Sequence, residues 1–129
     1  MHTLGIEIAG VAPGEVILDL PFRDDLVQQH GFLHAGVVTT AMDSACGYAA
    51  LTLMEPGAAV LSVEFKVNLL APARGRRFRA VGRVVRAGRT ITVVSGELLA
   101  FDAESGGDGR LVAILTGTMM SVRREGLVD

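Results

Sequence analysis

The longest apolar stretch of the chain contains a single formal charge. This stretch runs from Leu26 to Met54 (LVQQHGFLHAGVVTTAMDSACGYAALTLM), and its one charged side chain is Asp43. From Ala35 to Leu53 the residues are small or apolar on every side and include no proline, which is typical of a helix buried all round. Because a carboxylate without partners is costly in such a place, Asp43 is either a structural anchor or a chemical group.

Alternating apolar and polar positions before and after this helix predict strands. The expected strands are Thr3–Ile8, Gly14–Phe22, Ala59–Leu70, Arg76–Arg86, Thr90–Phe101 and Leu111–Val122. Breaks rich in glycine and proline separate them, and Glu55-Pro56-Gly57 ends the helix. The short connections after the helix predict an antiparallel meander of the last four strands.

Three glycines fall near the middle of the last three expected strands. At Gly82, Gly96 and Gly117 the missing side chain permits a bulge or a sharp coil, so we expect a sheet that curls around the helix. A curled sheet covers only one side of a helix. The other apolar face needs a cover, which we expect to be a second copy of the chain in a symmetric dimer. The candidate residues of that face are Val38, Met42, Cys46 and Ala49.

Length and composition narrow the class of protein. With 129 residues, half of them apolar, residues 1–129 are expected to form one domain with one core. No apolar run reaches the length of a membrane span without polar interruption, and the first ten residues lack the basic start of a secretory signal. The lone Cys46 cannot form an internal disulfide, so we expect a cytoplasmic protein.

The expected start of the helix is where chemistry is most plausible. No Ser, Thr, Asp or Asn immediately precedes Ala35 and Gly36 to cap the first amides. Uncapped N–H donors at the positive end of a helix suit an anion or a polarised carbonyl oxygen. Asp43 lies about two turns farther along, too deep to be a cap. The alternative is a helix end that water or a nearby loop satisfies.

These residues resemble the signature of hotdog-fold acyl-CoA thioesterases of the PaaI-like (phenylacetate-pathway) type. The similar string is Gln28-x5-His34-Ala35-Gly36-x6-Asp43, and the likeness extends from about Val16 to Val122. The family pattern has His-Gly-Gly and more often Asn at the upstream amide, so the alanine and the glutamine are departures. The resemblance implies an α+β hotdog fold, in which a curved antiparallel sheet of five to six strands wraps one long central helix.

The resemblance also implies a function and roles for residues. The protein would hydrolyse acyl-CoA thioesters without a cofactor or metal, as a homodimer or a dimer of dimers with its pocket across the dimer interface. Asp43 would be the general base or the nucleophile. The N–H of Ala35, with that of Gly36, would form the oxyanion hole. The remaining implied roles are carbonyl or water positioning by Gln28, loop shaping by His34 and water orientation by Ser62.

The residue types suit this chemistry independently of the family. An uncapped helix start stabilises the oxyanion of a tetrahedral intermediate, and a carboxylate attacks the thioester or deprotonates water. Apolar neighbours would weaken the solvation of Asp43 and make it a stronger base.

A basic run offers contacts for the phosphates of coenzyme A. Eight positive residues and no acidic residue lie between Lys66 and Gly96, and Arg suits phosphate groups. By resemblance, Arg86, Arg89 and Thr90 are the candidates for contacting the nucleotide end. The alternative is a solvated strand face in a chain that favours Arg. Nucleic-acid binding is less favoured because the run has only Phe78 for stacking.

Three other hypotheses about function remain open. Enoyl-CoA hydration on this fold would use Asp25 and His30, which have the typical spacing but lack the Asn-Pro that usually lies between them. A non-catalytic acyl-CoA-binding module is the second. A metal site at His30 and His34 is the third, but no further ligand is evident. Cys46, although a conceivable nucleophile, fits a helix core position better.

Overall fold

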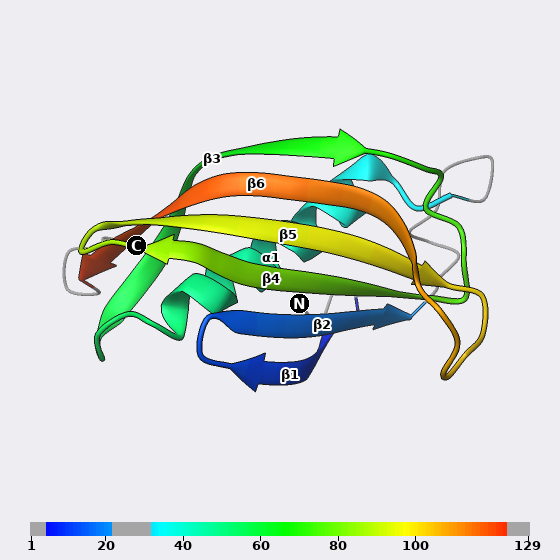
Figure 1. Cartoon of the computed structure of the whole chain (residues 1–129), viewed down its shortest axis with the longest axis horizontal. Coiled ribbons are helices and arrows are strands. Elements are labelled where there is room, and N and C mark those ends of the chain that lie inside the picture. Colours follow the sequence, from blue (N-terminus) through cyan, green and yellow to red (C-terminus); the bar gives the residue numbers. More distant parts are fainter. Residues whose placement is uncertain (1–4, 22–31, 124–129) are drawn as a thin grey trace.

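The computed structural model of the protein describes residues 5–21 and 32–123, which form one helix and a six-stranded antiparallel sheet. The elements are β1 (Glu7–Ala12), β2 (Glu15–Pro21), α1 (Ala35–Leu51), β3 (Ala58–Leu69), β4 (Arg77–Ala87), β5 (Ile91–Phe101) and β6 (Arg110–Arg123). The sheet has the order β1-β2-β4-β5-β6-β3, and α1 lies across one of its faces (Figure 1). The predicted fold class is confirmed.

The position of β3 differs from the sequence-based expectation. Only β4, β5 and β6 form a meander, because β3 pairs with β6 and not with β4. The link between β3 and β4 crosses the end of the sheet, where the N–H groups of Leu70 and Ala71 both donate to the carbonyl of Val112 (2.9 and 3.2 Å). The first strand also differs: it is Glu7–Ala12, later than the expected Thr3–Ile8, whose first residues lie outside the described part.

The sheet buries the apolar side of α1 completely. Val38, Met42, Cys46 and Ala49 are at most 2% exposed within a single chain. The expectation that these four residues form an uncovered face was therefore wrong. The exposed positions of the helix are small or polar instead, and they follow the spacing of one helical face: Gly36, Thr40 and Tyr48 are exposed and Ser44 is half-buried.

Glycines in the sheet allow this close approach of the helix. Gly82 pairs with Gly96 across β4 and β5. A Cβ atom on Gly82 would lie 2.3 Å from the carbonyl carbon of Ala45, and one on Gly96 would lie 2.9 Å from the Cys46 sulfur. The register shifts of the sheet fall elsewhere, among them one between Ser62 and Glu64 in β3. Gly82 and Gly96 therefore make room for the helix, and neither they nor Gly117 mark a bulge.

Strand β3 forms one edge of the sheet and is unusually apolar for an edge. Leu61, Val63 and Phe65 are 45, 54 and 41% exposed. A long edge strand presents unpaired backbone groups, and natural proteins normally protect such edges with charge, proline or a covering element. This edge is therefore a candidate contact surface.

Candidate active site

Asp43 meets Ser62 at the middle of the helix. The Ser62 hydroxyl donates a hydrogen bond of 2.8 Å to Oδ1 of Asp43 and also approaches the sulfur of Met119 at 3.3 Å. The Asp43 side chain is half-buried. Because a serine hydroxyl has one proton, Ser62 can only accept a further hydrogen bond from a water molecule while this bond is made. The structure thus brings together two of the predicted site residues.

The bulge in β3 positions Ser62. Ser62 pairs with Met119, and Phe65 pairs with Gly117, so both lie on the side of β3 that faces the helix. The register shift between Ser62 and Glu64 moves Glu64 to the outer side, where its carboxylate accepts from the Thr118 hydroxyl (2.6 Å). Without this shift, alternation would turn Glu64 toward Asp43.

The N-terminus of α1 has the free donors that the sequence predicts. His34 is the N-cap residue in extended conformation, and it makes no side-chain cap hydrogen bond. Its carbonyl accepts from the N–H groups of Val37 and Val38. Within the described residues, the N–H groups of Ala35 and Gly36 have no acceptor. His34 is exposed, and it caps the helix through its backbone carbonyl and not through its imidazole.

Within one chain, the carboxylate of Asp43 lies far from the free amides of Ala35 and Gly36. Asp43 follows Ala35 by eight positions, a rise of about 12 Å along a helix axis. One thioester carbonyl cannot contact both groups in the same subunit. A site that uses both therefore needs the helix N-terminus of one copy and the Asp43 of another.

An apolar cavity of about 470 Å³ opens beside the helix N-terminus. It lies between the start of α1 and the crossing that links β3 to β4, and His34 and Ala35 stand at its rim. A second cavity, of about 560 Å³, lies past the opposite end of the helix and has a lining of both polar and apolar residues. Arg89, Arg123, Glu55 and Ser121 are among the residues that line the second cavity.

Two arginines of the basic run are neutralised by carboxylates from neighbouring strands. Arg79 pairs with Asp19 (2.8 Å), and Arg83 pairs with both Glu15 (2.8 Å) and Glu97 (2.7 Å). The hydrogen bonds to Glu97 and Glu15 raise the pKa of Arg83. These arginines are therefore structural. Sequence reasoning missed this because their partners are distant in the chain.

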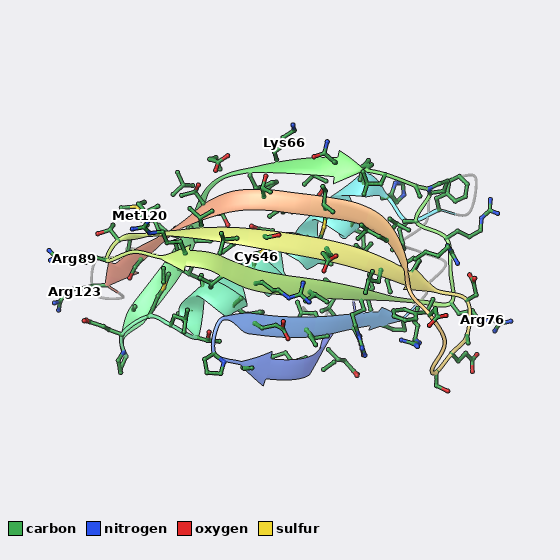
Figure 2. All side chains as sticks on the ribbon, in the orientation of Figure 1. Cys46, Lys66, Arg76, Arg89, Met120 and Arg123 are labelled. Carbon is green, nitrogen blue, oxygen red and sulfur yellow. The ribbon has the colours of Figure 1, made fainter. Side chains whose placement is uncertain are left out.

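Arg86 and Arg89, two of the three residues predicted to contact CoA, differ from Arg79 and Arg83 in their ion pairing. Within residues 5–21 and 32–123, no carboxylate pairs with Arg86 or Arg89. Figure 2 places Arg89 at the end of the sheet near Arg123, and Arg76 at the opposite end. Thr90 is exposed, and its carbonyl accepts from the Ser121 N–H. Arg89 and Thr90 lie in the turn between β4 and β5, whereas Arg86 is near the end of β4.

Cys46 is a core residue. Burial, with a further contribution from the negative charge of Asp43, raises the pKa of this thiol to about 12. Its sulfur is therefore protonated at neutral pH and unsuited to nucleophilic attack.

Other predicted residues lie outside the described part of the chain. These are Gln28, Asp25 and His30, and so the hydratase pair and one half of the His pair have no place in the structure. No group of three potential metal ligands occurs in the described residues. In the same residues, no helix has the length and apolarity needed to span a membrane.

Comparison with known proteins agrees with this architecture. A family model described as "Thioesterase superfamily" matches residues 30–106. A crystal structure of a thioesterase family protein from Silicibacter pomeroyi is 52% identical, with a TM-score of 0.90 over 95% of this chain and 88% of the other.

More distant relatives extend the comparison. The 1,4-dihydroxy-2-naphthoyl-CoA hydrolase of Listeria monocytogenes is 29% identical over 71% of this chain and 75% of its own length. The Escherichia coli PaaI protein shares the fold, with 20% identity and a TM-score of 0.81 over 94% of this chain and 82% of its own. The chain therefore belongs to the thioesterase superfamily, a family of thioester hydrolases, and has the hotdog fold of its PaaI-like members.

Proposed function

We propose that the protein hydrolyses acyl-CoA thioesters to a free acid and CoA, with Asp43 as the catalytic carboxylate. The observation that carries this proposal is that one chain offers two separate groups suited to the reaction: a half-buried Asp43 held by Ser62, and a helix N-terminus whose first two amides have no acceptor among the described residues. The relatives named for CoA thioester hydrolysis support the same substrate class.

The proposed reaction divides the work between these two groups. The thioester carbonyl oxygen accepts hydrogen bonds from the N–H groups of Ala35 and Gly36, which stabilise the negative charge of the tetrahedral intermediate. Asp43 removes a proton from a water molecule as that water attacks the carbonyl carbon. The C–S bond then breaks, and the proton held by Asp43 passes to the leaving thiolate. Direct attack by Asp43, followed by hydrolysis of the resulting anhydride, is the alternative order of events.

A second copy of the chain completes the proposed site. Asp43 and Ala35 are about 12 Å apart within one chain, so the amides must come from a neighbouring subunit. The edge strand β3 supports such an arrangement, because it carries Ser62 and also the exposed Leu61 and Val63. Pairing of β3 with its copy would cover this apolar edge and place the two helices close together.

The proposed contacts for the nucleotide end are Arg86, Arg89 and Thr90. In the part of the chain that the structure describes, Arg86 and Arg89 are among the residues of the basic run that have no ion pair, unlike Arg79 and Arg83. Arg89 also lines the second cavity, of about 560 Å³. Free guanidinium groups there suit the phosphates of CoA.

A substrate panel tests the proposal. The purified protein is assayed with acyl-CoA, enoyl-CoA and acyl-pantetheine substrates, and released thiol and hydrated product are measured separately. We expect thiol release from acyl-CoA. Hydration of enoyl-CoA without thiol release would support the rival hydratase, and tight binding without either product would support a binding module.

A further inference from the structure

We infer that the apolar cavity beside the helix N-terminus holds the acyl group, that this group is apolar and uncharged, and that Val112 sets its maximum size. The inference rests on the proposed function and specifies its substrate class. The cavity of about 470 Å³ lies within the range of about 300–1,000 Å³ usual for small-molecule sites.

The position of the cavity relates it to the reacting carbonyl. Ala35 lies at the rim, and its N–H has no acceptor within the described residues. A thioester oxygen bound to this amide places one substituent of the carbonyl in the cavity and the other outside it. The CoA arm is polar and charged, so the substituent that enters an apolar cavity is the acyl group.

The lining of the cavity excludes a charged acyl group. The side chains along it are apolar, with His34 at the rim as the one polar exception among the described lining residues. Arg74 is held over the ring of Phe32, a lining residue, with its guanidinium carbon 4.8 Å from the ring centroid. It lines a different hollow together with Arg110. An acyl group that ends in a carboxylate would therefore lose its hydration without gaining a partner in the cavity.

Two leucines extend the apolar surface at the mouth of the cavity. Leu69 and Leu70 are 58 and 52% exposed, although leucine is usually buried. Leu69 pairs with Ala113 and lies on the helix-facing side of β3, like Phe65 and Ser62. The apolar surface therefore continues along this side of β3, from the cavity toward Ser62.

Val112 lines the cavity and has a fixed backbone. The residue is 1% exposed, and its carbonyl accepts the N–H groups of both Leu70 and Ala71. Because these bonds fix the backbone and Val112 lines the cavity, we expect a larger side chain at this position to take up part of the cavity. The Val112→Phe variant should thus reduce the space for a long acyl group and leave room for a short one.

Kinetics with three substrates test the inference. The values of kcat/KM are measured for acetyl-CoA, octanoyl-CoA and succinyl-CoA on the wild type, on Val112→Phe and on Val11→Phe. The last is a matched control, because Val11 is an exposed valine of β1. We expect the wild type to prefer octanoyl-CoA over the other two by about tenfold or more. Val112→Phe should lower kcat/KM for octanoyl-CoA by about tenfold and leave acetyl-CoA within about twofold.

Further outcomes separate this inference from the proposed function. If Val112→Phe fails to fold, Leu70→Phe narrows the same cavity from an exposed position, and its ratio of octanoyl-CoA to acetyl-CoA hydrolysis should fall. An unchanged ratio in folded variants, or a preference for succinyl-CoA, would overturn the inference while leaving thioester hydrolysis in place. If the wild type hydrolyses no thioester, the proposed function fails. Calorimetric titration with octanoate then still tests whether the cavity holds an apolar chain. The inference requires that octanoate binds to the wild type and binds more weakly to Val112→Phe.

Discussion

The hydroxyl of Ser62 donates a 2.8 Å hydrogen bond to Oδ1 of Asp43, and this bond connects the edge strand of the sheet to the middle of the central helix. Nineteen positions separate the two residues in the chain. The bulge that follows Ser62 keeps the carboxylate of Glu64 on the opposite side of β3. Asp43 is thus a carboxylate in a fixed orientation.

Removal of the Ser62 hydroxyl should slow the reaction without unfolding the protein. In Ser62→Ala, Asp43 loses the donor that orients it, and we expect kcat to fall by about tenfold, the equivalent of about 1.4 kcal/mol, with little change in KM. Thr118→Val is the matched control, because it removes another hydroxyl–carboxylate bond, to Glu64, on the outer side of the sheet. Equal activity of the two variants would show that Ser62 does not act through Asp43.

We expect the two copies of the chain to associate through the β3 edge of the sheet. We expect a dimer at micromolar concentration by light scattering, and Val63→Asp should shift it toward monomer because the substitution places charge in an apolar edge. Ile8→Asp introduces the same charge at an exposed position of β1, the opposite edge strand, and should leave the dimer intact. A wild-type protein that is a folded, active monomer would contradict the two-subunit site.

Arg86 and Arg89 should contribute to the recognition of the nucleotide end. Replacing both with Ala is expected to raise KM for CoA thioesters at low salt, and to weaken the dependence of KM on ionic strength because two phosphate contacts are lost. Arg76→Ala, at the opposite end of the sheet (Figure 2), should have little effect. An equal rise in KM for pantetheine thioesters, which lack the nucleotide, would show that Arg86 and Arg89 do not contact the nucleotide end of CoA.

The buried Cys46 should make stability sensitive to high pH. Its pKa is raised from 9.0 to about 12 in the folded state, so its contribution to stability is complete below pH 9.0 and is lost as the pH rises toward 12. The melting temperature of the wild type should fall more steeply above pH 9 than that of Cys46→Ala. In the native protein at pH 8 the thiol should also react with a thiol reagent far more slowly than in the unfolded chain. Rapid native labelling would contradict this account.

The sequence was informative where local patterns decide the structure. The largely apolar, proline-free run after His34 predicted the central helix, and alternation predicted six strands close to their observed limits for all but the first. The missing cap before Ala35 is likewise a local feature, and the structure has no side-chain cap there. These predictions depend on short-range propensity and capping, which the residues themselves encode.

Features set by long-range pairing could not be read in the same way. The link between β3 and β4 looks like a hairpin connection, yet it crosses the sheet because β3 pairs with β6. The apolar helix face was expected to need a partner, but the glycine pair Gly82 and Gly96 brings the sheet close enough to bury it. The partners of Arg79 and Arg83 come from β2 and β5 and are invisible to a count of local charge.

In the proposed mechanism Asp43 performs the chemistry and is not needed for the fold, and the variant Asp43→Asn separates these two roles. Asp43→Asn keeps the size of the side chain and an oxygen that can accept the Ser62 hydrogen bond, but it removes the base. Single-turnover hydrolysis of an acyl-CoA should slow by at least about a hundredfold. The melting temperature should stay the same or rise, because a half-buried charge is gone. A variant that melts early yet hydrolyses its substrate at the normal rate would contradict the catalytic assignment.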